Sequence, residues 1–201
     1  MIAIIDYGMG NLRSVQKAFE KVGAAAIITQ KPEDIKKAAK VVLPGVGAMK
    51  PAIEKLEALD LIPTIKETIK SGKPFLGICL GLQLLFDESN EGGKVRGLGI
   101  VPGNVTRFTK LKVPHMGWNQ IQIKNQECAI LKGISNLANV YFCHSYFVAP
   151  KNTAATAALT DYGVHFTSAF AENNIFGVQF HPEKSQETGL KILKNFTELN
   201  A

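Results

Sequence analysis

The alternation of short apolar runs with helical patterns in the first half of the chain constrains its fold more than any other feature. Four apolar runs predict strands, and the segments between them predict helices because their apolar residues recur at helical spacing. Strands that alternate with helices pair in parallel through right-handed crossovers. We therefore expect an open, mainly parallel sheet flanked by helices. The predicted strands are residues 2–6, 25–29, 41–43 and 75–79, and the predicted helices are 12–22, 32–39, a region reaching residue 69 with a break near Pro63, and 80–87.

The second half of the chain has a different pattern, in which β-branched and aromatic runs follow one another with turn residues between them. These runs predict extra antiparallel strands beside the parallel sheet, so the expected class is an α/β fold. The sequence contains no repeat or linker, and we expect residues 1–201 to form a single domain. The predicted strands here are 100–108, 119–123, 140–148, 154–159, 165–170 and 175–180, and a helix is expected at 186–199.

The composition narrows the classes of function. Hydrophobic residues make up 46% of the chain and charged residues 20%, which is typical of a globular protein, and no apolar stretch approaches the ~20 residues that cross a bilayer. The N-terminal run reaches Asp6 without a basic segment, so we expect a strand and not a signal peptide. The formal charge of +6 comes from scattered lysines. Scattered lysines indicate solvated helix faces and argue against nucleic-acid binding, and a basic rim that faces an acidic protein partner is the remaining alternative.

The cysteines and histidines limit the chemistry further. Three cysteines without close spacing indicate a reducing cytoplasm and no disulfide framework. The four histidines include no pair at the spacing of zinc ligands, so we expect neither a metal site nor a cofactor. Catalysis, if there is any, must then come from side chains.

Cys79 stands between a predicted strand and a predicted helix, in the segment Gly-Ile-Cys-Leu-Gly. Glycines two residues before and after it let the strand and the helix approach closely, as in a nucleophile elbow, where a tight turn exposes the reactive side chain. A buried structural cysteine is the simpler alternative, since that is the commonest state of a free cysteine. The local sequence favours the elbow.

A thiol nucleophile needs a base, and His181 is the best candidate because it also follows an apolar strand. Pro182 disfavours helix at the histidine and keeps the segment extended. Residues two apart in an extended chain point to the same side, so Glu183 can reach back to one imidazole nitrogen while the other faces the sulfur. An acid in that place fixes the tautomer of the base, as the third member of a triad does.

A cysteine–histidine pair suits acyl transfer through a thioester, which requires hydrogen-bond donors for an oxyanion. One donor would be the backbone N–H of Leu80. The second is expected from the loop at 44–47, where Gly45 and Gly47 allow a peptide plane to turn its N–H toward a substrate. The same loop would also fit a plain strand-to-helix turn.

Three segments together resemble the class I, triad-type glutamine amidotransferases, which have a flavodoxin-like sheet. The resemblance covers essentially the whole chain, and it implies a glutaminase with Cys79 as nucleophile, His181 as base and Glu183 as orienting acid. The segments are Pro-Gly-Val-Gly (44–47), Gly-Ile-Cys-Leu-Gly-Leu-Gln (77–83) and Gln-Phe-His-Pro-Glu (179–183).

The resemblance also implies which residues hold the amino and carboxylate ends of glutamine. They are Gln83 and the strand around His144, Ser145 and Tyr146. A hydrogen-bonded strand histidine is the plainer reading of His144. Cys143 is a departure, since an ordinary apolar residue is expected there, and it adds a second thiol near the expected pocket.

Further segments resemble one branch of this family, the glutaminase subunits that serve a synthase of histidine biosynthesis. The resemblance implies that ammonia passes to a cyclase subunit with a (β/α)8 barrel in a heterodimer. A shielded path makes physical sense because ammonia in water at neutral pH becomes ammonium, which is no nucleophile. Aromatic and methionine residues suit an interface, although Trp118 would fit ordinary core packing equally well. The segments are 6–11, 114–119 and 184–185, and the expected interface residues are Asn11, His115, Met116, Trp118 and Lys184.

Three other functions are compatible with parts of the sequence. One is another class I amidotransferase subunit, and another is a cysteine peptidase or amidase on a similar sheet. The close spacing of His181 and Glu183 argues against the peptidase. The third is a non-catalytic module that retains the fold, which the intact set of triad residues disfavours.

Overall fold

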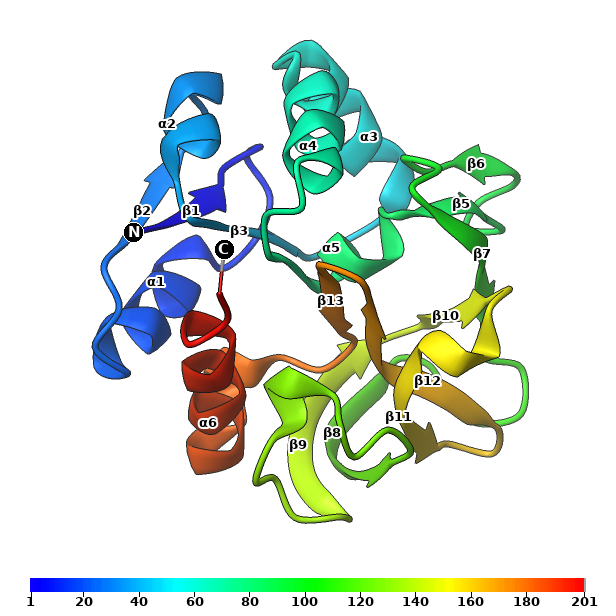
Figure 1. Cartoon of the computed structure of the whole chain (residues 1–201). Helices are drawn as coiled ribbons and strands as arrows, with labels where there is room; N and C mark the ends of the chain where they lie inside the picture. The colour runs from blue at the N-terminus through cyan, green and yellow to red at the C-terminus, as the bar shows by residue number, and fades with distance from the viewer. Residues whose placement is uncertain (201) are drawn as a thin grey trace.

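The computed structural model describes residues 1–200 and shows an α/β fold built on a nine-stranded sheet (Figure 1). Five strands at one end of this sheet run parallel, and the remaining strands extend it in antiparallel fashion. The expected fold class is thus confirmed. In spatial order the strands are β2 (Ala26–Thr29), β1 (Ile2–Ile5), β3 (Lys40–Gly45), β4 (Phe75–Cys79), β13 (Ile175–Val178), β12 (His165–Glu172), β11 (Thr156–Asp161), β8 (His115–Ile123) and β9 (Ala138–His144).

Helices cover both faces of the parallel part, as the alternation of strands and helices predicts (Figure 1). Alternate residues of β1 point into different cores: Ile2 and Ile4 pack with one pair of helices, whereas Ala3 and Ile5 pack with the other set. A strand buried on both faces reads as a continuous apolar run, which explains the pattern of β1. The first pair is α1 (Leu12–Lys21) and α6 (Gln186–Thr197), and the other set is α2 (Pro32–Lys37), α3 (Met49–Ala58) and α4 (Leu61–Lys70).

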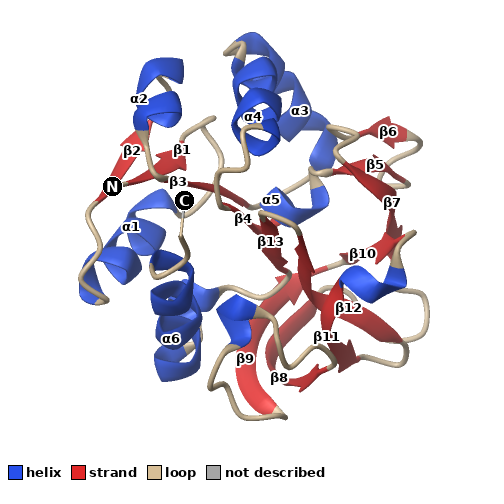
Figure 2. Ribbon diagram, viewed as in Figure 1, coloured by secondary structure: helices blue, strands red, loops and turns tan. Residues whose placement is uncertain are grey.

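The second half of the chain adds strands far more than helices (Figure 2). Besides extending the large sheet, it contributes two strands of a four-stranded sheet that packs against β12 through its outer strand, β10. The expected run at 140–148 is split at Ser145, so that its two halves belong to different sheets. In order, the small sheet consists of β10 (Tyr146–Pro150), β7 (Val101–Arg107), β5 (Phe86–Ser89) and β6 (Val95–Arg96).

Two of the expected helices are wrong in their limits. The expected helix at 80–87 is only α5 (Leu80–Gln83), because the residues that follow pair with β7 as a strand. The break expected near Pro63 lies at Asp60, which has a positive φ of 50°. Pro63 is the third residue of α4, where a missing N–H is harmless because the first turn of a helix has no internal acceptors.

The carboxyl ends of β1, β3, β4 and β13 meet at one edge of the sheet, where the expected triad and the loop of the expected oxyanion donor lie. Within residues 1–200, we find no helix of sufficient length and apolar character for a membrane span.

Candidate active site

Cys79 occupies a strained turn between β4 and α5, with φ 54° and ψ −110°. Such a conformation is costly for a non-glycine residue and persists only when the surroundings hold it. The neighbouring glycines explain how it is held. A Cβ at Gly77 would lie 2.7 Å from Cα of Leu82, and a Cβ at Gly81 would collide with the carbonyl oxygen of Leu43. The strand, the turn and the helix can therefore meet only with glycine at both positions.

His181 and Glu183 follow β13, the strand that pairs in parallel with β4. Nδ1 of His181 lies 2.9 Å from Oε1 of Glu183, and both side chains are almost completely buried. His181 is held from a second side, because the hydroxyl of Ser185 donates to its carbonyl oxygen at 2.6 Å. The acid and the base thus have the relation expected from their spacing in the sequence.

The electrostatic surroundings of His181 favour its protonated form. Burial lowers the pKa of this histidine, but hydrogen bonding and the charges of Cys79 and Glu183 outweigh burial and raise the pKa to about 10. An imidazole that holds a proton this firmly can withdraw one from a nearby thiol. It can later return that proton to a departing amine.

The end of β3 and the loop after it lie beside Cys79, the expected nucleophile. Gly45 is the parallel-sheet neighbour of Cys79, and Gly47 has a φ of 90° that disfavours other residues. Val46 between them is 40% exposed, so its peptide units border the solvent side of the site. This is the place at which a second oxyanion donor is expected.

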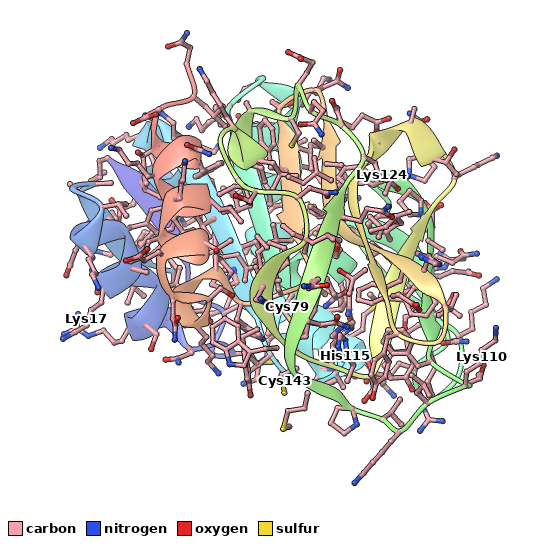
Figure 3. The ribbon with its side chains drawn as sticks, turned by 90° about the horizontal axis from the view of Figure 1, so that it is seen from below. Lys17, Cys79, Lys110, His115, Lys124 and Cys143 are labelled. Carbon is pink, nitrogen blue, oxygen red and sulfur yellow. The ribbon has the colours of Figure 1, made fainter. Side chains whose placement is uncertain are left out.

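A cavity of about 280 Å³ opens beside the sulfur. It brings together residues from six separate parts of the sequence: the loop after β3, the elbow, the segment at Glu91, the segment at Pro114, the β9–β10 junction and the segment after β13. Figure 3 shows Cys79 beneath the strands of the second half, with Cys143 labelled close by. The expected site residues that line the cavity are Gly47, Cys79, Leu80, Gln83, His144, Ser145, Tyr146, His181 and Lys184.

Two of the expected glutamine-binding side chains are already engaged within the protein. Nε2 of Gln83 donates to the carbonyl oxygen of Tyr146 at 2.9 Å and to Oε1 of Gln179 at 3.0 Å. Both ring nitrogens of His144 have protein partners, His115 and the Tyr146 carbonyl oxygen. The ring of His144 therefore has no free nitrogen for a ligand, and its alternative interpretation as a hydrogen-bonded strand histidine fits the structure.

The expected interface residues fall into two groups. Asn11 and Lys184 are exposed, as are Met116 at 61% and Trp118 at 49%. The exposure of Trp118 excludes the core-packing alternative. His115 is only 3% exposed, because β8 alternates and turns this residue toward the interior, so its expected contact with a partner is wrong in this structure.

Sequence reasoning missed two residues that contact the site. Gln179 is fully buried, and its Nε2 lies 3.6 Å from the sulfur of Cys79. The sequence could have indicated Gln179, because it is a polar residue at the end of an apolar strand. It also stands two positions before His181, and residues two apart in an extended chain face the same side. Tyr7 is 1% exposed, and its hydroxyl lies where a side chain on Gly45 would be. Burial, followed by the charge of Cys79, raises the pKa of Tyr7 above its ordinary value.

Comparisons with known proteins identify the family of the chain. Residues 3–199 match the glutamine amidotransferase class-I family. Imidazole glycerol phosphate synthase subunit HisH of Syntrophotalea carbinolica is 52% identical, over 99% of this chain and 100% of the relative. The subunit of the same name from Geobacter sulfurreducens is 51% identical, over 98% of each chain.

Solved structures show the same fold at much lower identity. A crystal structure of a glutamine amidotransferase superposes with a TM-score of 0.76 and is 14% identical, over 98% of this chain and all of the other. A chain of the PurLQS structure from Thermotoga maritima gives a TM-score of 0.75 at 16% identity, over 98% of this chain and 96% of the other.

The chain therefore belongs to the class-I glutamine amidotransferase family, and it is an enzyme of that class. Within this class it belongs with the HisH subunits, the glutaminase subunits of imidazole glycerol phosphate synthase. The resemblance expected from its motifs is confirmed at both levels.

Proposed function

We propose that the chain hydrolyses glutamine to glutamate through a triad of Cys79, His181 and Glu183 and delivers the ammonia to a cyclase subunit. The observation that carries this proposal is the position of His181, which contacts Glu183 at 2.9 Å and has its pKa raised by Cys79 as well as by that acid. A base held between a thiol and a buried carboxylate is the arrangement that activates a cysteine nucleophile.

The chemistry follows from the geometry. His181 takes the proton of the Cys79 thiol, and the sulfur attacks the amide carbon of glutamine. The oxyanion is stabilised by the N–H of Leu80 and by an N–H of the loop at Gly45 and Gly47. His181 then protonates the leaving nitrogen, ammonia departs, and water hydrolyses the thioester to glutamate.

The glutamine occupies the cavity beside Cys79. Ser145 and Tyr146 form one wall of this cavity and present backbone groups to the ends of the substrate. Gln83 contributes its carbonyl oxygen, since its two amide protons are already donated within the protein. Residues 1–201 act as one amidotransferase domain, which the family match across residues 3–199 supports.

The partner is a cyclase subunit with a (β/α)8 barrel, in a heterodimer located in the cytoplasm and active in histidine biosynthesis. The names of the relatives support a second subunit, because each is one subunit of a synthase. The exposed Met116 and Trp118 support a docking surface near the cavity, and exposed Asn11 and Lys184 extend it. Direct transfer into the partner prevents ammonia from becoming ammonium in water.

The replacement Cys79→Ala tests this division of labour in the presence of the cyclase. We expect glutamine-dependent synthesis to fall by about 10⁴-fold or more, as when a catalytic nucleophile is removed, while synthesis from ammonium salts is retained. Cys143→Ala is the matched control, because this second thiol lies near the same cavity and should leave glutamine-dependent synthesis intact. Loss of both activities in Cys79→Ala would contradict the proposal.

A further inference from the structure

Two histidines form a buried pair behind the wall of the cavity. His115 at the start of β8 lies directly opposite His144 of β9, and Nδ1 of His115 is 3.0 Å from Nε2 of His144. The two residues are 3% and 6% exposed. The ring of His115 is stacked between Phe142 and Tyr162, with ring centroids 4.7 and 4.0 Å away. The proposed reaction uses neither ring directly, so the pair needs another explanation.

Asn119 fixes the direction of hydrogen bonding at one end of the pair. Its Oδ1 accepts the backbone N–H of Gln120 at 2.8 Å, and its Nδ2 donates to the carbonyl oxygen of Asp161 at 2.9 Å. These two backbone groups orient the amide, so its second proton points to Nε2 of His115 at 3.2 Å. Nε2 of His115 is therefore the acceptor. The proton of His115 is on Nδ1, and it is donated to His144.

The other end of the pair is fixed independently. Nδ1 of His144 lies 2.8 Å from the carbonyl oxygen of Tyr146, which can only accept, so the proton of His144 is on Nδ1. Its Nε2 is then the acceptor for His115. Both ends give the same two tautomers, and each ring is neutral. Burial agrees with this, since it lowers the pKa of His115 to about 4 and that of His144 to about 3.

The chain of hydrogen bonds continues from this pair to the nucleophile. The carbonyl oxygen of Tyr146 also accepts from Nε2 of Gln83 at 2.9 Å. Gln83 in turn donates to Gln179, and Nε2 of Gln179 lies 3.6 Å from the sulfur of Cys79. His115 is thus connected through one peptide carbonyl to the side chains beside the sulfur of Cys79, and Figure 3 labels both residues.

We propose that His115 is a positioning residue for glutamine binding, which holds His144 in one tautomer and thereby fixes the Ser145–Tyr146 wall of the cavity. The inference rests on the proposed function of the cavity as the glutamine site. Without the donor on His115, Nε2 of His144 would be a buried acceptor with no partner, which is costly. The ring would then turn, release the Tyr146 carbonyl and disorder the wall. Glutamine binding should suffer more than the chemical step.

Two replacements at His115 separate hydrogen bonding from packing. His115→Phe keeps a ring between Phe142 and Tyr162 but has no donor. We expect it to raise KM for glutamine by about tenfold or more while kcat stays within about threefold, as for a residue whose loss affects binding. In His115→Asn the side-chain NH2 replaces the Nδ1 donor, so KM should stay within about threefold of the wild type. His165→Phe, on an exposed histidine, is the matched control and should leave KM unchanged.

Asn119→Ala is a second test of the role of His115. It leaves the core intact, because Asn119 is only half-buried. It removes the group that orients His115, and we expect KM for glutamine to rise by about threefold or more. Equal rises in KM for His115→Phe and His115→Asn would assign the effect to packing and overturn the inference. A fall in kcat at unchanged KM in His115→Phe would do the same.

Nitrogen-15 NMR of the wild-type chain tests the tautomers without any assay of activity. The inference requires a proton on Nδ1 and none on Nε2 in both His115 and His144. A proton on Nε2 of either ring would overturn it. Failure of the proposed function would be seen differently, as a wild-type chain that releases no glutamate from glutamine with its cyclase present.

Discussion

At the scale of single residues, buried polar atoms divide into those that have partners and those that lack them. His181 and Gln179 have partners, since Nδ1 of His181 lies 2.9 Å from Oε1 of Glu183 and Nε2 of Gln179 lies 3.6 Å from the sulfur of Cys79. The hydroxyl of Tyr7 and Oε2 of Glu183 have no partner among the residues that the structure describes. Such atoms reduce stability, and in natural proteins they gather at functional sites.

Tyr7→Phe should increase stability, because it removes a buried hydroxyl that has no hydrogen-bond partner in the described structure. We expect the free energy of unfolding in urea to rise by about 1 kcal/mol. Tyr162→Phe is the control with the opposite sign, since its hydroxyl donates to the carbonyl oxygen of Lys112 at 2.8 Å. A loss of stability in Tyr7→Phe would mean that this hydroxyl has a partner in solution.

The buried pair of His115 and His144, whose pKa values are lowered by burial, should make the protein sensitive to acid. Burial lowers the pKa of His115 to about 4, whereas the unfolded chain has its ordinary value of 6.5. The contribution of neutral His115 to the free energy of unfolding is fully present above pH 6.5. It is lost as the pH falls toward 4, because in that range only the unfolded state takes up the proton. When the pH is lowered from 7 to 5, the free energy of unfolding should decrease in both proteins. The decrease should be about 2 kcal/mol smaller in His115→Phe than in the wild type.

Urea unfolding at the two pH values measures this difference. His165→Phe changes an exposed histidine and should follow the wild-type dependence on pH. Parallel behaviour of His115→Phe and the wild type would show that His115 is protonated in the folded protein at pH 5.

At the scale of elements, the turn between β4 and α5 determines how the proposed nucleophile, Cys79, is presented. The strands β4 and β3 and the short helix approach one another so closely that Gly77 and Gly81 leave no space for a methyl group. The helix α5 has only four residues, so the position of Cys79 depends on this packing and on its strained backbone.

Gly81→Ala should therefore disrupt the elbow. Its new Cβ would collide with the carbonyl oxygen of Leu43, and we expect a loss of about 3 kcal/mol or more in the free energy of unfolding, with loss of glutaminase activity. Gly72→Ala is the matched control, because Gly72 has a φ of 82° but nothing within 4 Å of the added methyl. It should cost about 1 kcal/mol and leave activity intact. Equal effects of the two variants would contradict this account of the elbow.

At the scale of the whole molecule, the parallel half of the sheet carries the proposed nucleophile and base, and the junction between β9 of the large sheet and β10 of the small sheet forms one wall of the cavity beside them. The exposed face of β8 and β9 beside this cavity carries Met116 and Trp118, with Lys184 over the ring of Tyr141 at 5.7 Å. A partner that covers this face would lie next to the point at which ammonia is released.

Trp118→Ala tests the docking surface. An aromatic side chain at the centre of an interface often contributes 2 kcal/mol or more, so we expect affinity for the cyclase to fall by about 30-fold. Leu137→Ala is the matched control, because this leucine is 50% exposed at the opposite end of the β8–β9 pair. Titration calorimetry with the purified cyclase measures both. Equal affinities of the wild type and Trp118→Ala would indicate that the partner binds another face of the molecule.

The sequence by itself determined the parts of this protein that depend on local patterns. Buried parallel strands are continuous apolar runs, whereas the helices between them have apolar residues at helical spacing. The first half of the sheet could therefore be predicted from the apolar residues. Cys79 with its flanking glycines and His181 with Glu183 are also local, since a tight turn and a two-residue spacing put each group in its place.

Only the tertiary structure decided the features that depend on pairing between distant segments. The helix expected at 80–87 ends early because residues 86–89 pair with β7, and pairing outweighs local helix propensity. The sequence around His115 gave no reason to bury it. Its partner His144 is 29 positions away, and the two meet only because β8 and β9 pair in one register. Register is a property of the assembled sheet, and it fixes which side chains face the interior.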